Sequence, residues 1–196
     1  MKILPSSFFN RPTLDVAQSL IGCVLARKFK GRIKRLMITE AETYDGFKDK
    51  ASHASRGKTK RNEVMFRSAG HIYIYFTYGM HWMLNIVTGP KDYPAAILIR
   101  GGIDLDTDSN TNTPVNGPAR LTKYLGITGG LNGKKLGRAS GLWIEARTPL
   151  MTAQLKDSRA IKRMPRIGVD YAGPVWSKKK WRFVLMESRE NHAIKF

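Results

Sequence analysis

The sequence predicts a single domain that combines helices with a mostly antiparallel β-sheet. The chain has 196 residues and a mass of 22.1 kDa, which is the size of one ordinary domain. Hydrophobic residues make up 42% of it, enough to build a core and too many for a disordered chain. Strand-like segments follow one another without an internal repeat or a linker between them. We therefore expect one domain over residues 1–196.

The N-terminal quarter predicts one helix and two strands. Pro12 suits the first turn of a helix, and Gly22 suits its end. Between them, apolar residues recur at helical spacing: Leu14, Ala17, Leu20 and Ile21. Residues 23–29 alternate weakly and residues 33–44 form a longer alternating run, so both favour strands. Asp45-Gly46 predicts the turn that follows.

The middle of the chain predicts three further strands. Residues 51–57 suit one or two helical turns, and residues 71–78 are dense in Ile, Tyr and Phe, which favours a strand. A tight turn is expected at Gly79-Met80. Residues 82–88 and 95–100 then predict two more strands.

The C-terminal half is more polar. Residues 104–116 are rich in Asp, Asn, Thr and Ser and predict a surface loop. Pro118 can open a helix that runs to Leu125, with Gly126 as its cap. Strands are expected at 142–146 and 181–186, and the basic segment 156–166 is expected to be partly helical.

The charge points to an anionic partner. Lys and Arg number 34 against 15 Asp and Glu, which gives a net charge of +19 and a pI near 10.3. Such a chain attracts polyanions, so nucleic acid, a membrane surface and nucleotides are the candidates. The one cysteine, Cys23, excludes an internal disulfide and a four-cysteine zinc site. Without a signal peptide or a transmembrane run, an intracellular protein that does not enter a membrane is expected.

Three familiar motifs fail on inspection. The spacing of Asp104, Asp106 and Asp108 opens like an EF-hand loop, but Ser109 stands in place of its glycine and Val115 in place of its glutamate. The segment 129–135 has the wrong spacing for a P-loop. The His, Glu and Cys signature of zinc deaminases is absent from the sequence.

Two glutamates and a histidine are candidates for chemistry. Strand parity predicts that one face carries Leu36, Ile38, Glu40, Glu42 and Tyr44. A carboxylate at the rim of an apolar face loses solvation, which raises its pKa towards that of a useful base. The alternative is an exposed strand end where the glutamates pair with basic residues. His53 lies among small residues that leave space for a flat ligand, although the basic run 56–61 beside it also fits a solvated loop.

Aromatic residues gather in the segment 71–78. Tyr73, Tyr75 and Tyr78 beside basic stretches are suited to base stacking, which is worth about 1–3 kcal/mol per base. An aromatic core strand is the alternative, and we prefer it for Phe76.

These segments together resemble the alkyladenine (3-methyladenine, methylpurine) DNA glycosylase family. The resemblance extends from Pro12 to Phe183. It rests on motifs in the same order: Glu-Ala-Glu-Thr-Tyr-Asp-Gly at 40–46, Ala-Ser-His-Ala at 51–54, Arg-Asn-Glu-Val-Met-Phe at 61–66, Tyr-Ile-Tyr-Phe-Thr-Tyr-Gly-Met-His at 73–81, Asn-Ile-Val at 85–87, Ala-Ile-Leu-Ile-Arg at 96–100, Gly-Pro-Ala-Arg-Leu at 117–121 and Arg-Ile-Gly-Val at 166–169.

The resemblance implies an α+β fold, with a curved antiparallel β-sheet and surrounding helices, and a set of site residues. Glu42 matches the general base that activates water. Arg100 and the backbone carbonyl of Ile167 match groups that hold this water. The remaining matches form the base pocket or enter the duplex: Tyr44, His53 and Tyr75 stack on the base, Ala51 contacts it through its backbone, Asn85 disfavours a 2-amino group, and Tyr78 intercalates. In the family, Ala41 and Thr43 usually stand in exchanged order.

The implied activity is that of a monofunctional glycosylase in base excision repair. It would flip alkylated or deaminated purines out of double-stranded DNA (3-methyladenine, 7-methylguanine, hypoxanthine, ethenoadenine) and hydrolyse the N-glycosidic bond as a monomer, with no cofactor and no metal. A bacterial protein would work in the cytoplasm or nucleoid, and a eukaryotic one in the nucleus. Two alternatives remain: a non-enzymatic, basic nucleic-acid-binding protein, and a metal nuclease using Glu40, Glu42, Asp45 and His53.

Overall fold

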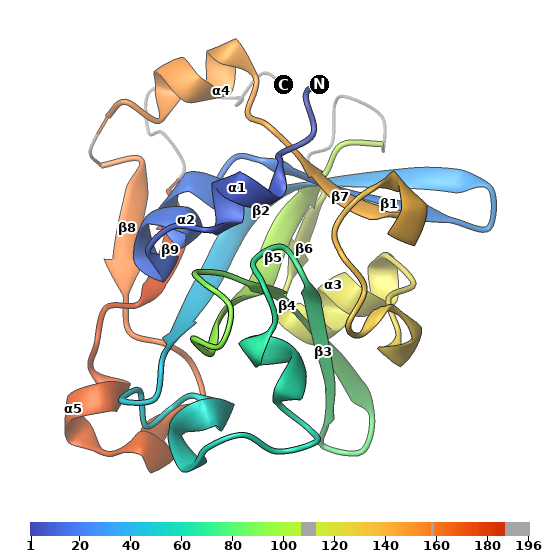
Figure 1. Ribbon diagram of the computed structural model, residues 1–196. Coiled ribbons are helices and arrows are strands. Elements are labelled where there is room, and N and C mark those ends of the chain that lie inside the picture. The colour runs from blue at the N-terminus through green and yellow to red at the C-terminus, as the bar shows by residue number, and fades with distance from the viewer. Residues whose placement is uncertain (107–112, 158, 187–196) are drawn as a thin grey trace.

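A single antiparallel sheet of nine strands organises the computed structural model, which describes residues 1–106, 113–157 and 159–186. The main strand order is β3-β4-β5-β2-β1-β7, with β6 paired to β5, β9 paired to β2, and β8 paired to β9. Figure 1 shows the sheet curling as it passes from β7 to β3. The strands are β1 (Val24–Phe29), β2 (Arg32–Asp45), β3 (Ile72–Thr77), β4 (His81–Val87), β5 (Ala95–Asp104), β6 (Pro114–Asn116), β7 (Leu142–Glu145), β8 (Ile161–Met164) and β9 (Arg182–Leu185).

Short helices surround this sheet and confirm the α+β class. The α2 helix packs on β2 and β5, and α3 packs on β4 and β5 (Figure 1). The α-helices are α1 (Ser6–Phe9), α2 (Thr13–Leu20), α3 (Pro118–Tyr124), α4 (Pro149–Gln154) and α5 (Pro174–Ser177). The 3₁₀ helices are η1 (His53–Arg56), η2 (Glu63–Phe66), η3 (Gly129–Leu131), η4 (Arg138–Ser140) and η5 (Asp170–Ala172). In the described ranges, no helix is long and apolar enough to cross a bilayer.

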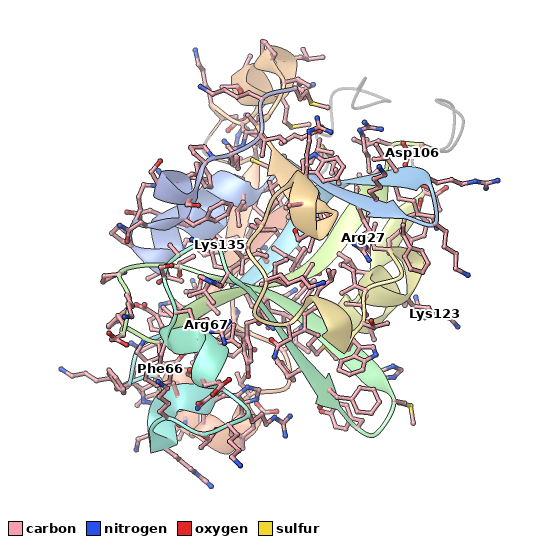
Figure 2. The ribbon with its side chains drawn as sticks, turned by 45° about the vertical axis from the view of Figure 1, so that its right-hand side comes forward. Arg27, Phe66, Arg67, Asp106, Lys123 and Lys135 are labelled. Carbon is pink, nitrogen blue, oxygen red and sulfur yellow. The ribbon has the colours of Figure 1, made fainter. Side chains whose placement is uncertain are left out.

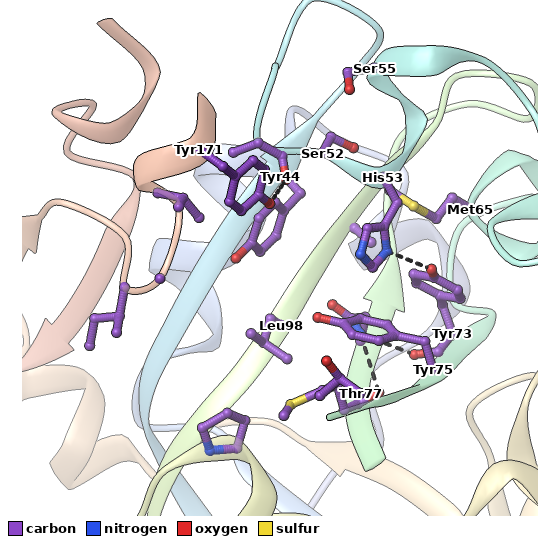
Figure 3. A pocket seen from close by; sticks show the side chains of 18 of the residues that line it. Tyr44, Ser52, His53, Ser55, Met65, Tyr73, Tyr75, Thr77, Leu98 and Tyr171 are labelled. Carbon is purple, nitrogen blue, oxygen red and sulfur yellow. Dashed lines mark hydrogen bonds between the residues drawn. The ribbon is translucent and has the colours of Figure 1, made fainter. Parts of the chain in front are cut away.

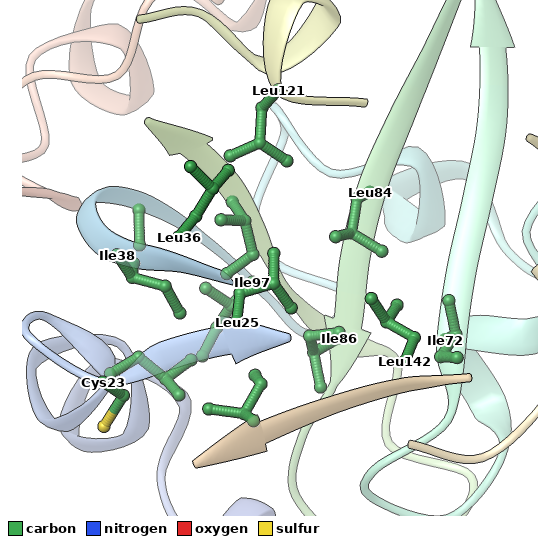
Figure 4. Close-up of a cluster of buried hydrophobic side chains, with 14 of the residues drawn as sticks. Cys23, Leu25, Leu36, Ile38, Ile72, Leu84, Ile86, Ile97, Leu121 and Leu142 are labelled. Atoms are coloured by element: carbon green, nitrogen blue, oxygen red, sulfur yellow. The ribbon is translucent and has the colours of Figure 1, made fainter. Parts of the chain in front are cut away.

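The hydrophobic core lies between one face of the sheet and the helices α2 and α3. Ala17 and Leu20 of α2 have no exposed surface, as the helical spacing of the sequence predicts; Val16 is equally buried, and Leu14 is only partly buried. Figure 4 shows strand residues of this core converging, with Leu121 reaching in from α3. Basic side chains point outward around the molecule, Lys123 among them (Figure 2). The fold therefore separates an apolar interior from a cationic surface.

The strand β2 changes its inward face halfway along, which corrects the prediction that its even-numbered residues share one face. Leu36 and Ile38 lie in the core, and so does Ala41. The register with β5 shifts between Ile38 and Ala41, as in a β-bulge, and after the shift Glu42 turns away from the core. Gly102 of β5 permits the close approach here, because a Cβ on it would lie 2.7 Å from the carbonyl oxygen of Met37.

Two segments differ from the sequence predictions. Residues 104–116 were expected to form a surface loop, but β5 continues to Asp104 and Pro114–Asn116 pairs with it as β6. Residues 107–112 lie outside the described residues. The segment 156–166 was expected to be partly helical, but Ile161–Met164 forms β8. Its two central side chains are exposed, because β8 pairs with β9 at the outside of the sheet.

The tight turn between β3 and β4 has Tyr78 and Gly79 at its centre, one residue earlier than expected. The Met80 N–H donates to the Thr77 carbonyl. Tyr78 has a φ of 52° and Gly79 a φ of 66°, the signs of a type I′ hairpin turn. Tyr78 therefore holds a backbone conformation that is costly for a residue with a Cβ.

The Thr43 hydroxyl lies buried with no hydrogen-bond partner among the described residues. An unsatisfied buried hydroxyl costs about 1–3 kcal/mol. Thr43→Val keeps the shape and removes the hydroxyl, so it should raise the free energy of unfolding by about 1 kcal/mol in urea denaturation. Thr88 is the matched control, since it is equally buried and its hydroxyl donates to Thr13. Thr88→Val should lower the free energy of unfolding, because it removes a hydroxyl that makes a hydrogen bond. An equal decrease in the free energy of unfolding of both variants would contradict the prediction.

Candidate active site

A cavity of about 820 Å³ opens on the sheet face opposite the core. Strands β3, β4 and β5 supply side chains of one parity to it, and their neighbours of the other parity lie in the core. The rest of its wall comes from the end of β2, the loop 50–56, the segment 167–171 (Figure 3), and the single residues Met65, Tyr78 and Pro118. Alternation along the strands therefore makes one face of the sheet the core and the other the cavity floor.

The structure brings the predicted site residues together at this cavity. Eight of them line it: Tyr44, Ala51, His53, Tyr75, Tyr78, Asn85, Arg100 and Ile167. The ninth, Glu42, has no exposed surface and lies just behind the wall, where it contacts three of the others.

Hydrogen-bond donors from three parts of the chain hold the Glu42 carboxylate. Its Oε1 accepts the backbone N–H of Ile167 at 2.8 Å. Its Oε2 accepts the Tyr44 hydroxyl at 3.0 Å and the Arg100 Nη1 at 3.3 Å. Burial raises the pKa of Glu42, although Arg100 and these hydrogen bonds act in the opposite direction. The site thus contains a carboxylate with raised basicity.

A second glutamate holds Arg100 in place. Glu40 Oε1 accepts from Arg100 Nε at 3.2 Å and from Arg182 Nη1 at 2.9 Å. The glutamates do pair with basic residues, but they do so largely out of solvent and not at an exposed strand end.

Aromatic rings surround the cavity. The rings of His53 and Tyr75 lie edge to face at 4.6 Å, and Tyr44 lies opposite them across the cavity (Figure 3). His53 Nδ1 lies 2.9 Å from the Tyr73 hydroxyl. Burial lowers the pKa of His53, assisted by Arg61, so the imidazole is neutral at pH 7. Burial also raises the pKa of Tyr75 to about 12 and that of Tyr73 further, so both phenols keep their protons.

Hydrogen bonds fix Asn85 on the cavity floor and Ala51 in the loop 50–56. The Asn85 amide nitrogen donates to the carbonyls of Tyr73 and Met83, both at 3.3 Å, which sets the orientation of the amide. The Ala51 carbonyl accepts the Tyr171 hydroxyl at 2.9 Å. Tyr78, by contrast, is 82% exposed at the tip of the β3–β4 hairpin beside the cavity mouth.

Sequence reasoning named Tyr73 as a candidate for base stacking and Glu40 as a candidate for chemistry, but it foresaw neither the contact of Tyr73 with His53 nor that of Glu40 with Arg100. Tyr73 shares the parity of Tyr75, and this signal could have identified it as the partner of His53. The role of Glu40 could have been identified only through its contact with Arg100. The buried pair of Asp49 and Arg166 joins residues 117 positions apart, and no local pattern indicates it.

The four residues of the nuclease alternative do not gather into one metal site. Asp45 accepts the Thr13 hydroxyl and His53 contacts Tyr73, whereas Glu40 and Glu42 both contact Arg100. Within the described part of the chain, no group of three His, Cys, Asp or Glu side chains could hold a metal ion.

Comparison with known proteins agrees with this geometry. A family model described as methylpurine-DNA glycosylase matches residues 7–189. A protein of Methanocella arvoryzae, provisionally named a 3-methyladenine DNA glycosylase, is 39% identical over 93% of this chain and 92% of its own length. Proteins with the same provisional name match from Myxococcus xanthus (39% identical, 96% of this chain and 93% of theirs) and Psychrobacter cryohalolentis (38%, 91% and 89%). The chain belongs to the methylpurine-DNA glycosylase family.

Proposed function

We propose that this chain is a monofunctional DNA glycosylase that flips alkylated or deaminated purines out of double-stranded DNA and hydrolyses their N-glycosidic bonds. The family gives the reaction class, release of methylated purines from DNA. The observation that carries the mechanism is the buried Glu42 behind an aromatic cavity, held by Ile167, Tyr44 and Arg100. The proposed substrates are 3-methyladenine, 7-methylguanine, hypoxanthine and ethenoadenine.

Glu42 acts as the general base in this proposal. A water molecule between Glu42 and the sugar C1′ loses its proton to the carboxylate as the glycosidic bond breaks. The raised pKa of Glu42 makes it a stronger proton acceptor than an exposed carboxylate would be. Arg100 and the backbone of Ile167 flank Glu42, where they can orient this water. A cationic methylated base that leaves with the bonding electrons becomes a neutral molecule, whereas a neutral base such as hypoxanthine would leave as an anion and therefore takes up a proton.

The cavity compensates for removing a base from the duplex. Flipping costs a few kcal/mol of stacking and pairing. Tyr44, His53 and Tyr75 offer rings against which the flipped base stacks, and a cationic methylated base gains further from electron-rich rings. Tyr78, exposed at the hairpin tip, fills the gap left in the duplex. The net charge of +19 supplies cations for the distorted phosphate backbone.

His53 gives neutral lesions a hydrogen bond. If the Tyr73 hydroxyl donates to Nδ1, the proton of the neutral imidazole lies on Nε2 and can be donated into the cavity. A methylated cationic base is a good leaving group without this help, whereas hypoxanthine is not.

The alternatives predict different measurements. A binding protein would retain duplexes without releasing a base, and a metal nuclease would break phosphodiesters and stop when a chelator is added. We expect base release that a chelator does not affect, measured on duplexes that each carry one defined lesion. We further propose that the protein acts as a monomer, because the cavity, Glu42 and the donors that hold it form a complete site without a second copy.

Glu42→Gln should retain lesion binding and lose base release. The amide keeps the size of the side chain but removes the proton acceptor. Loss of a general base typically lowers the reaction rate about 10²–10⁴-fold. The measurement is the single-turnover release rate at saturating protein. Glu40→Gln is the comparison, because it changes a neighbouring carboxylate that contacts Arg100 and has no bond to Ile167 or Tyr44. A greater loss in Glu40→Gln would transfer the role of base to that residue.

Tyr73→Phe should slow the release of hypoxanthine more than that of 7-methylguanine. The variant keeps the ring and removes the hydroxyl that orients His53. One hydrogen bond contributes about 0.5–1.5 kcal/mol, so we expect about a 2–10-fold change in the ratio of the two release rates. Equal slowing of both bases would indicate that Tyr73 only supports the fold of the pocket.

Asn85→Ser should raise the release of guanine relative to hypoxanthine, which differs from guanine only by lacking the 2-amino group. The fixed amide of Asn85 lines the cavity, and a tight polar wall rejects a group that it leaves without a partner. The ratio of single-turnover rates in identical duplexes measures this discrimination. An unchanged ratio in an active variant would place the discrimination elsewhere.

A further inference from the structure

A buried ion pair lies behind the cavity and outside the set of site residues that the sequence predicted. Arg166 and Asp49 have no exposed side-chain surface. They form two parallel hydrogen bonds, Nη1 to Oδ2 at 2.6 Å and Nη2 to Oδ1 at 2.8 Å. Arg166 directly precedes Ile167, and Asp49 lies in the loop that leads to Ala51. The pair thus joins two of the segments that form the site.

The same two side chains also bind the backbone around them. Arg166 Nη1 donates to the carbonyl of Thr43, the residue between Glu42 and Tyr44, at 2.8 Å. Asp49 accepts the backbone N–H groups of Asp45 at 3.2 Å and Ala51 at 3.1 Å. The end of β2, the base-contacting loop and the segment around Ile167 are therefore held to one another at a single point.

The Arg166 guanidinium also supports an aromatic wall of the cavity. Its carbon lies 4.9 Å from the centre of the Tyr44 ring and 5.0 Å from that of Trp181. The Trp181 carbonyl in turn accepts the backbone N–H of Thr43. A planar cation between these contacts restrains the position of the Tyr44 ring, whose hydroxyl donates to Glu42.

Stability alone does not account for this arrangement. Removing two charges from water costs several kcal/mol per ion, and apolar replacements of buried pairs are often neutral or stabilising. The Arg166 Nε, moreover, has no hydrogen-bond partner among the described residues. An apolar pair could not make the directed hydrogen bonds that fix three backbone segments.

We propose that Asp49 and Arg166 are positioning residues for the glycosylase reaction, which hold the Ile167 N–H and the Tyr44 hydroxyl on the Glu42 carboxylate. The proposal rests on the function proposed above. Neither residue touches the substrate. Arg166 acts through its neighbour Ile167 and through Thr43 and Tyr44, and Asp49 fixes the loop at Ala51.

The test compares Arg166→Lys and Arg166→Met with Arg147→Lys and Arg147→Met. Lysine keeps the charge but cannot make the planar set of bonds to Asp49 and Thr43. Arg147 is the matched control, because it also clamps backbone carbonyls, those of Ile21 and Gln18, and does not line the cavity. The readouts are single-turnover release and binding on a duplex with one hypoxanthine, well below the unfolding midpoint of each variant.

Both Arg166 variants should release base about 10–100-fold more slowly per folded molecule while lesion binding changes much less, because a misplacement of about 1 Å costs up to about 10²-fold. The Arg147 variants should lose stability without a change in release. Arg166→Lys should be less impaired than Arg166→Met, which leaves Asp49 buried without its cation.

The pH dependence of base release distinguishes misplaced groups around Glu42 from a general loss of the fold. The groups facing Glu42 are Arg100, the Ile167 N–H, Tyr44 and Glu40, with Tyr75 and Tyr171 at longer range. Loss of the Ile167 and Tyr44 bonds removes hydrogen bonds to the charged carboxylate and so raises its pKa further. Because the base works only when ionised, the acidic limb of the release profile should move to higher pH in the Arg166 variants and stay in place in the Arg147 variants.

Two outcomes would reject the inference, and a third would reject the proposed function on which it rests. Folded Arg166 variants with wild-type release and an unchanged acidic limb would show that the pair does not position Glu42. Failure of both variants to fold, with the Arg147 variants folded, would make the pair a folding element only. Absence of base release by the wild-type protein would instead reject the proposed function.

Discussion

The buried carboxylate of Glu42 is the constraint from which the arrangement of the site follows. A carboxylate without contact to solvent requires hydrogen-bond donors, because an unpaired buried charge is very costly. Glu42 takes its donors from β5, from its own strand and from a segment 125 residues away. Two of these donors are in turn held by further groups, Arg100 by the partly buried Glu40 and the Ile167 segment by the buried Arg166. Burial of one group thus explains a whole layer of polar contacts behind the cavity.

The β-bulge in β2 allows one long strand to serve both the core and the site. Before the shift, Leu36 and Ile38 point into the core, and after it Ala41 does, so that Glu42 and Tyr44 face away. Beside this part of β2 the strand β5 alternates regularly, with Ile97 and Ile99 in the core and Leu98 at the cavity. Arg100 stands at this irregularity and reaches both glutamates. A continuous alternation would have placed Glu42 on the core face.

Local sequence patterns predicted most of the strands, and the family resemblance predicted the residues of the site. The seven strands expected from apolar alternation are present, and the matched residues converge on one cavity. The face of Glu42 was assigned through parity, and the bulge invalidates that argument because a register shift leaves no local signal in Thr39 or Glu40. Strands β6 and β8 were missed since their polar residues become strands only through pairing with a neighbour. Asp49 and Arg166 meet only in the folded chain, so no spacing rule could have paired them.

Several groups that are costly to the fold lie around the site, although Lys30 and Asp92 also hold a positive φ and the buried Arg27 Nε also lacks a partner among the described residues elsewhere in the fold. Tyr78 holds a positive φ at the hairpin tip, the Thr43 hydroxyl and the Arg166 Nε lack partners among the described residues, and two charges are buried together beside the cavity. Elsewhere the sheet is covered by a close-packed apolar core. Such costs persist when the conformation is needed for function and the surrounding structure determines it. A rigid sheet with one face in the core therefore carries, on its other face, a buried carboxylate and the polar groups that hold it.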